Sequence, residues 1–110
     1  MSEKSFTYLR DIKNAINSIE SFIKNMTFTQ FQSDDKTSNA VIRKFEIIGE
    51  ATKNIPNSIR EKHSHIPWKD IAGMRERLIH AHSEVDLKLV WMTIKQRLPE
   101  LKSVIEEILG

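Results

Sequence analysis

The stretch YLRDIKNAINSIESFIKNM, residues 8–26, decides the fold class, because its apolar side chains recur with the period of an α-helix. This spacing gathers them on one face of the helix and leaves polar side chains on the other. The apolar face consists of Tyr8, Leu9, Ile12, Ala15, Ile16, Ile19, Phe22, Ile23 and Met26. A helix with one apolar face must bury that face, so the stretch predicts one helix of a bundle.

A second long helix is predicted after a polar, broken connection at residues 27–38, which has room for one short turn of helix. Ser33, Asp34 and Asp35 supply the acceptors and negative charge that suit its N-terminus. Gly49 lies inside this helix and costs about 1 kcal/mol relative to alanine, which indicates close packing against a neighbour. Pro56 ends the helix, because the residue before a proline disfavours helical geometry.

The remaining sequence is also helical in its spacing. Residues 57–66 predict a short helix and a turn, and Pro67 suits the first position of a helix that continues to about His82. Residues 83–86 supply a turn and a cap. The final helix covers residues 87–108, where Pro99 should kink it or split it in two. No segment alternates with period two, so we expect an all-α, up-and-down four-helix bundle with short extra helices.

Length and composition set broad limits. The 110 residues suit a single domain, 1–110, and the formal charge of +2 does not by itself indicate nucleic-acid binding. The absence of cysteine excludes disulfides, zinc–thiolate sites and thiol nucleophiles. The first residues, MSEKSFTYLRD, lack the apolar run expected of a signal peptide, and no apolar run approaches the roughly 20 residues of a membrane span. We therefore expect a cytoplasmic protein.

The stretch AGMRERLIHAHSEVD, residues 72–86, combines an arginine and two histidines in one predicted helix. At about 100° per residue from Ile71, Arg75 falls near 40° and His82 near 20°, within the apolar face, whereas His80 falls near 180°. Arginine on an apolar face is costly unless it is paired. Arg75 could therefore pair with Glu46 or Glu50 inside the bundle, extend its guanidinium to the solvent at the edge of the bundle, or belong to a functional site.

Metal binding is disfavoured by the same geometry. Residues two apart on a helix point about 200° away from one another, so one ion cannot bind both His80 and His82. His63 and His65 form a similar pair in a predicted irregular segment, where exposed polar side chains are the simpler interpretation. For His80 alone, the simplest interpretation is a solvated side chain hydrogen-bonded to Glu76 one turn earlier. We expect no metal and no other cofactor.

The segment IPWKDIAGMRERLIHAHSEVDLKLVWMTIKQRLPEL, residues 66–101, resembles the HepT-like family of HEPN-domain ribonucleases. The family signature is an arginine, four residues, a histidine, one residue and usually a tyrosine. Here it reads Arg75, four residues, His80, Ala81 and His82. FEIIGEATKNIP, residues 45–56, is similar to the family's long central helix, so the resemblance covers nearly the whole chain.

This resemblance implies a metal-independent endoribonuclease, the toxin of a toxin–antitoxin pair whose antitoxin is a minimal nucleotidyltransferase. The catalytic residues would be Arg75 and His80, with Glu76, Arg77 and His82 in supporting or RNA-contacting roles. The family forms homodimers in which two motifs face one cleft. A second chain could therefore place its Arg75 near the first chain's His80, although the two residues diverge on one helix.

Two positions depart from the family pattern. Glu76 replaces a residue that is often asparagine, and a carboxylate near a scissile phosphate would repel it unless it orients His80. His82 replaces the tyrosine that the antitoxin modifies with AMP in related systems, so no modification is expected at this position. The alternative to an enzyme is a non-catalytic module that docks a nucleotidyltransferase or binds RNA without cutting it.

Overall fold

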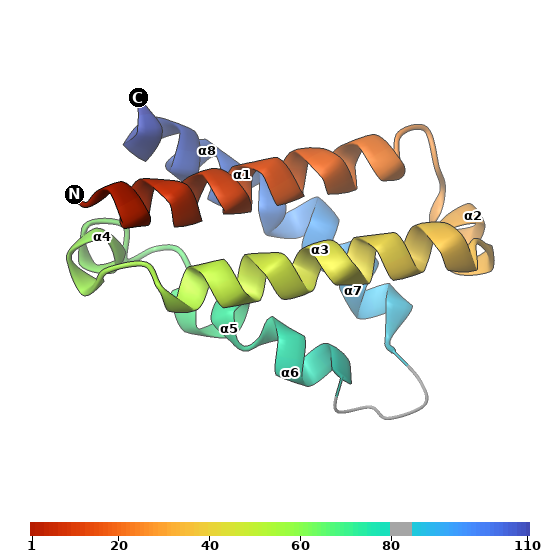
Figure 1. Cartoon of the computed structure of the whole chain (residues 1–110). Helices are drawn as coiled ribbons and strands as arrows, with labels where there is room; N and C mark the ends of the chain where they lie inside the picture. The colour runs from red at the N-terminus through yellow and green to blue at the C-terminus, as the bar shows by residue number, and fades with distance from the viewer. Residues whose placement is uncertain (80–84) are drawn as a thin grey trace.

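The computed structural model describes residues 1–79 and 85–110, and every regular element in these two ranges is helical. The two long helices are α1, Glu3–Phe22, and α3, Asp35–Lys53, which lie side by side in opposite directions (Figure 1). A third arm consists of α5, Trp68–Ala72, and α6, Met74–Ile79. The fourth arm consists of α7, Leu87–Gln96, and α8, Leu98–Leu109. The predicted all-α, up-and-down bundle is confirmed.

The two short extra helices lie at opposite ends of the bundle (Figure 1). The connection predicted at residues 27–38 contains α2, Phe28–Ser33, which anchors itself by burying Phe31 completely. Thr27 caps α2 in a capping box with Gln30. Asp34 caps α3, as its sequence position predicted. At the other end, α4, Asn57–Lys62, confirms the short helix after Pro56.

The core lies along the bundle axis and is supplied by all four arms. The apolar face predicted from residues 8–26 is buried at most of its positions, but Phe22 is 39% exposed. The fully buried large side chains are Leu9, Ile12, Ile16, Ile19, Phe31, Val41, Phe45, Ile48, Leu78, Leu98, Leu101 and Ile105. Burial of such side chains contributes about 1.5–3 kcal/mol each, so this core is the main source of stability.

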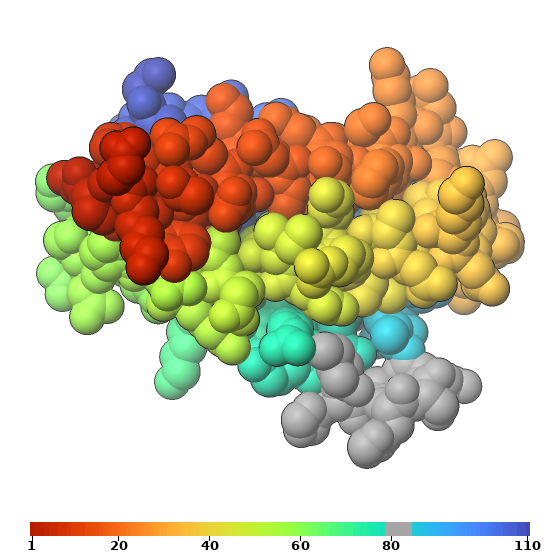
Figure 2. All heavy atoms as spheres, viewed as in Figure 1, coloured from red at the N-terminus to blue at the C-terminus, as the bar shows by residue number. Residues whose placement is uncertain are grey.

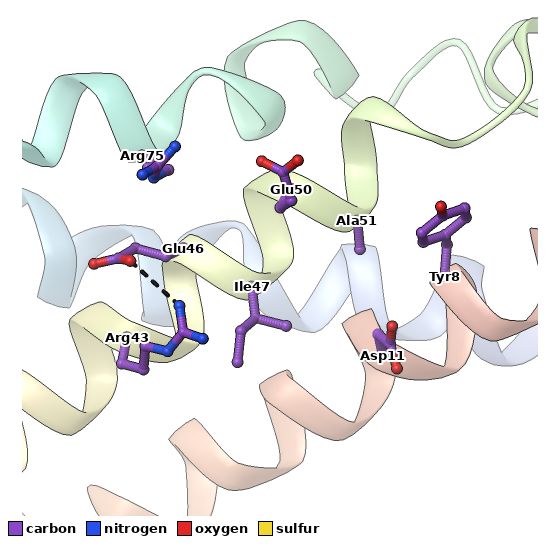
Figure 3. Close-up of a pocket in the computed structure, with 8 residues that line it drawn as sticks. All are labelled: Tyr8, Asp11, Arg43, Glu46, Ile47, Glu50, Ala51 and Arg75. Carbon is purple, nitrogen blue, oxygen red and sulfur yellow. Dashed lines mark hydrogen bonds and ion pairs between the residues drawn. The ribbon is translucent and has the colours of Figure 1, made fainter.

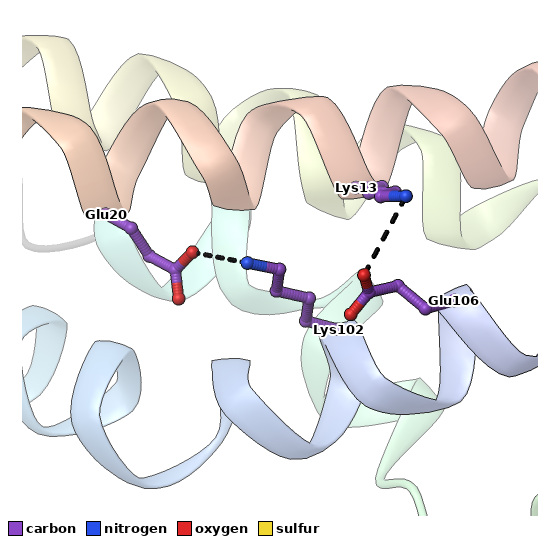
Figure 4. Close-up of polar contacts among 4 residues, drawn as sticks. All are labelled: Lys13, Glu20, Lys102 and Glu106. Carbon is purple, nitrogen blue, oxygen red and sulfur yellow. Dashed lines mark hydrogen bonds and ion pairs between the residues drawn. The ribbon is translucent and has the colours of Figure 1, made fainter.

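The first and last helices are also joined by two ion pairs. Lys102 Nζ lies 2.8 Å from Glu20 Oε1, and Lys13 Nζ lies 3.8 Å from Glu106 Oε2 (Figure 4). Because the Glu20 carboxylate accepts a hydrogen bond from Lys102, the pKa of this lysine is raised above its ordinary value. Both pairs are partly exposed to solvent, so they orient α8 on α1 more than they stabilise the fold.

Pro99 divides the last arm, as predicted. It occupies the second position of α8, where a missing backbone N–H has no helical partner to lose. Arg97 lies between α7 and α8, and the apolar face continues from Val90 and Ile94 to Leu98 and Leu101. Both halves therefore bury their side chains in the same core.

The continuous helix predicted from Pro67 to about His82 is wrong in its described part. It ends at Ala72, and α6 begins at Met74 after a turn at Gly73. Gly73 has no side chain, and glycine disfavours an uninterrupted helix at this point. The last part of that prediction, residues 80–82, lies outside the described residues.

Candidate active-site helix

Helix α6 carries three of the five predicted site residues, and all three are exposed. Met74 and Leu78 are 6% and 2% exposed, and among residues 74–78 they are the two that fix which side of α6 packs on the bundle. Around a helix, Arg75 and Arg77 then flank the buried side at about 80°, and Glu76 lies opposite it. The prediction that Arg75 lies within the buried face is wrong, because Ile71, the reference for that prediction, belongs to a separate helix.

The other two predicted residues, His80 and His82, lie outside the described residues. Their predicted positions relative to Arg75, and the predicted hydrogen bond between His80 and Glu76, therefore stay predictions. What the structure does describe is the helix that leads into them, which ends at Ile79.

Arg75 lines an open groove of about 460 Å³ between α1, α3 and α6, which we call the Arg75 groove. Figure 3 shows Glu50 on the side of α3 that faces the helix of Arg75, whereas Glu46 extends sideways and pairs with Arg43. No ion pair joins Arg75 to either of these two carboxylates, whereas Arg43 Nη1 lies 3.4 Å from Glu46 Oε2. The full lining is Tyr8, Asp11, Arg43, Glu46, Ile47, Glu50, Ala51 and Arg75.

The charges of the Arg75 groove indicate from which side a phosphate can reach the guanidinium of Arg75. Three carboxylates and two guanidinium groups give the lining a formal charge of −1. A phosphate would therefore be repelled from its floor. Because Arg75 is exposed, its guanidinium can instead meet a phosphate at the rim, while the carboxylates behind it keep the cation attracted to this side of α3.

Glu76 has a defined partner on the central helix. Lys53 Nζ donates to Glu76 Oε1 at 3.0 Å, and this hydrogen bond is the main reason that the pKa of Glu76 is lowered from its ordinary value. The sequence suggested that Glu76 either repels phosphate or orients His80. The ion pair with Lys53 offsets the negative charge of Glu76 at neutral pH and holds α6 against α3. The sequence pattern did not indicate this pair, because the two residues are 23 positions apart.

The Glu76–Lys53 pair predicts a specific titration change. Lys53→Gln removes the main donor, so the pKa of Glu76 should rise toward its ordinary value of 4.5. A carboxyl with a depressed folded-state pKa stabilises the fold above its unfolded pKa, and this contribution fades as pH falls through the folded pKa. Carboxyl-detected NMR titration of both proteins measures the shift. An unchanged Glu76 titration would contradict the pair.

Arg77 spans the break between α5 and α6. Its Nη2 donates to the backbone carbonyl of Asp70 at 2.7 Å, a group near the C-terminus of α5 that needs a partner. The side chain is exposed, so this bond leaves the remaining guanidinium donors available to solvent or a ligand. The predicted RNA-contacting role of Arg77 stays a prediction, and the structure adds a bridging role.

Gly49 explains how closely α3 approaches this helix. A β-carbon at position 49 would lie 3.3 Å from the Ala72 carbonyl oxygen and 3.7 Å from the β-carbon of Arg75. The predicted close packing at Gly49 is confirmed, and its neighbours are the last two residues of α5, Ile71 and Ala72, and the second residue of α6, Arg75. The backbone that carries Arg75 is therefore positioned directly by the central helix.

Gly49→Val should destabilise the protein by about 1–3 kcal/mol, because two extra methyl groups are forced against the backbone at Ala72. Asn39→Val is the matched control, since Asn39 is exposed on the same helix and reports only the cost of a β-branched residue. Urea unfolding of the three proteins measures the difference. Equal stability of the two variants would contradict the close approach at Gly49.

The sequence is similar to that of a known protein family. The family model described as Ribonuclease HepT-like matches residues 12–108. The chain belongs to this family. A protein named "Probable ribonuclease HepT" from Thermococcus cleftensis is 48% identical over 92% of this chain and 92% of its own length. A candidate RNase by name, from Caldanaerobacter subterraneus subsp. tengcongensis, is 43% identical over 93% of this chain and 91% of its own length.

A third relative carries the matching region beside another activity. In Methanocaldococcus jannaschii, a protein named as a gamma-glutamylcyclotransferase and candidate RNase is 45% identical over 93% of this chain but 46% of its own length. No solved structure matches the chain. Within the described residues, no helix has both the length and the apolar character needed to cross a membrane.

Proposed function

We propose that the protein is a metal-independent endoribonuclease in which Arg75 and His80 act on the scissile phosphate. One observation carries the proposal: in a member of the HepT-like ribonuclease family, Arg75 is exposed on α6 and precedes His80 by the spacing of the family signature. An arginine buried in an ion pair would have favoured a purely structural role.

The proposed reaction uses the nucleophile that RNA itself carries. The 2′-oxygen forms a bond to the neighbouring phosphorus, and the bond from phosphorus to the 5′-oxygen breaks. The 2′-hydroxyl loses its proton and the leaving 5′-oxygen gains one, so the products are a 2′,3′-cyclic phosphate and a 5′-hydroxyl. His80 can serve either proton transfer, because the pKa of histidine lies near neutral pH.

Arg75 would act on charge rather than on protons. Its guanidinium presents planar N–H donors that fit two phosphate oxygens, and it stays protonated throughout. Donors placed where negative charge develops stabilise the transition state more than the substrate. The exposed position of Arg75 at the rim of the Arg75 groove supports this role, since a phosphate can approach it without crossing the carboxylates behind it.

The assembly and the partner are proposals that rest on family resemblance. A two-fold homodimer would bring two α6 helices to one cleft, so that each site could combine residues of both chains. The partner would be a minimal nucleotidyltransferase antitoxin. Because His82 stands where the family usually has tyrosine, we propose that neutralisation does not use AMP transfer at position 82. The relative that joins this region to a cyclotransferase supports residues 1–110 as one domain.

An RNase assay in EDTA tests the proposed activity. Purified protein is incubated with unmodified single-stranded RNA, in parallel with His80→Ala. We expect cleavage by the wild-type protein only. Binding of the RNA without cleavage by either protein would favour the non-catalytic module instead, and cleavage that disappears in EDTA would contradict metal independence.

A further inference from the structure

A surface formed by α2 and α7 gathers two partly exposed aromatic rings and two lysines, and we call it the α2–α7 platform. Phe28 and Trp91 are half-buried, with ring centroids 6.1 Å apart. Lys88 Nζ lies 5.5 Å from the centre of the Phe28 ring, and Lys95 Nζ lies 4.8 Å from the centre of the Trp91 ring. Each ring therefore has an ammonium group over it.

The core holds the ring of Trp91 in place, whereas the lysine side chains of the platform can move. Phe31 is fully buried and its ring centroid lies 5.2 Å from that of Trp91, so the core holds Trp91 in place. Lys88 and Lys95, in contrast, are exposed side chains on flexible stems. A cation over an exposed ring gains only about 0.5–1 kcal/mol, so either lysine can leave its ring at little cost.

The local charge favours an anionic ligand. Helices α2 and α7 contain no acidic residue, and Lys88 and Lys95 are the basic residues of these two helices. The nearest acidic residue before α7 is Asp86, whose Oδ1 accepts the backbone N–H of Leu89 at 3.0 Å as the helix cap. Asp86 lines the same pocket as Phe28 and Lys88, but its carboxylate is engaged at the positive end of α7. Asp34, which follows α2, is engaged likewise because its Oδ1 accepts the backbone N–H of Thr37 at the start of α3.

We propose that the α2–α7 platform binds a single-stranded segment of the RNA substrate, an inference that rests on the proposed ribonuclease function. Unpaired bases would stack on Phe28 and Trp91, and Lys88 and Lys95 would move from the rings to the flanking phosphates. Aromatic faces beside flexible cations are the arrangement that binds single strands without reading sequence. The ligand must have exposed bases, because bases within a duplex are already stacked.

Helix α7 directly follows the proposed catalytic segment in the sequence. Helix α7 begins at Leu87, shortly after His80 and His82 in the sequence, and Val85 lines the same surface pocket as Phe28 and Lys88. Figure 1 shows α2 and the start of α7 at the same end of the bundle. A strand bound here would therefore lie along the helix that follows the catalytic motif.

Fluorescence of Trp91 tests the stacking directly. The probe is a short mixed-sequence single strand with 2′-O-methyl groups, which cannot be cleaved because its nucleophile is blocked. The second tryptophan, Trp68, is buried and donates its indole N–H to the His63 carbonyl, so its emission should not respond. We expect the probe to quench Trp91 in a Trp68→Phe protein. If that protein is unstable, probe anisotropy with wild-type protein replaces the measurement.

Binding of the same probe to surface variants separates stacking from charge. We expect Phe28→Leu to weaken binding roughly tenfold, a typical loss for one stacked base. Lys88→Gln combined with Lys95→Gln should reduce the salt dependence by roughly 0.7 per lysine in the slope. Lys62→Gln is the control, because Lys62 is exposed on α4 at the other end of the bundle and should bind as wild type.

Three outcomes would overturn the platform. The first is full affinity of Phe28→Leu for the probe together with unchanged Trp91 emission. The second is loss of affinity in the double lysine variant while Phe28→Leu binds as wild type. The third is tighter binding of duplex RNA than of single-stranded RNA. A change of Trp91 emission with protein concentration alone would place a second copy of the chain there instead. If the platform does not bind the probe but the protein still cleaves unmodified RNA, the proposed ribonuclease function stands. Absence of both binding and cleavage would remove both proposals.

Discussion

His80→Ala should reduce RNA cleavage by about 10²- to 10⁴-fold, the range expected when a general acid or base is removed. A histidine that transfers a proton in the transition state changes the maximal rate, while the affinity for RNA depends on other groups. We therefore expect the variant to bind the uncleavable 2′-O-methyl probe as wild type does. Rates from single-turnover assays and affinities from anisotropy measure the two quantities separately.

The control for this prediction is a second histidine outside the motif. His65→Ala removes an exposed imidazole whose Nε2 lies 3.7 Å from Glu100 Oε1 on α8. It should leave the cleavage rate unchanged. If His80→Ala cuts RNA at the wild-type rate, or if both variants lose activity equally, His80 is not the proton-transfer group.

Arg75→Ala should lower the cleavage rate by about 10²- to 10³-fold, as for the loss of one donor that stabilises developing charge. Because Arg75 is exposed and lacks an ion pair with Glu46 or Glu50, we expect its loss to change the free energy of unfolding by no more than about 0.5 kcal/mol. Arg43→Ala is the matched control, since Arg43 lines the same groove but lies on α3. Full activity of Arg75→Ala would contradict its catalytic role.

Mixing the two inactive variants tests whether a site combines residues of both chains. A heterodimer of Arg75→Ala and His80→Ala would contain one site with an intact arginine from one chain and an intact histidine from the other. Such a site should restore part of the activity. If the mixture stays inactive although the chains exchange, each site uses Arg75 and His80 of the same chain, or the enzyme is not a dimer.

Helical periodicity predicted the architecture well, because burial of one helix face is a local property of the sequence. The stripe in residues 8–26, the cap at Asp34, the split at Pro99 and the tight packing at Gly49 were all readable in this way. Each depends on residues within one or two helical turns, or on a residue type with a single strong conformational effect.

The position of Arg75 could not be read by the same method. A helical wheel carries an angular error across any interruption, and the turn at Gly73 separates Ile71 from the helix that holds Arg75. The Lys53–Glu76 pair was missed for a different reason, because it joins two helices whose alignment depends on the whole bundle. The contact of Trp91 with Phe28 and Phe31 was missed because a polar connection with one short turn of helix does not indicate which later helix it contacts.

The chemical ends of the cleaved RNA test the central claim most directly. Wild-type protein is incubated in EDTA with unmodified RNA and with the same RNA carrying a 2′-deoxy sugar at the cut position, and the products are analysed by mass spectrometry. We predict a 2′,3′-cyclic phosphate and a 5′-hydroxyl from the first RNA and no cut at the deoxy position of the second. Fragments with a 5′-phosphate and a 3′-hydroxyl, or an intact first RNA, would contradict the proposed reaction.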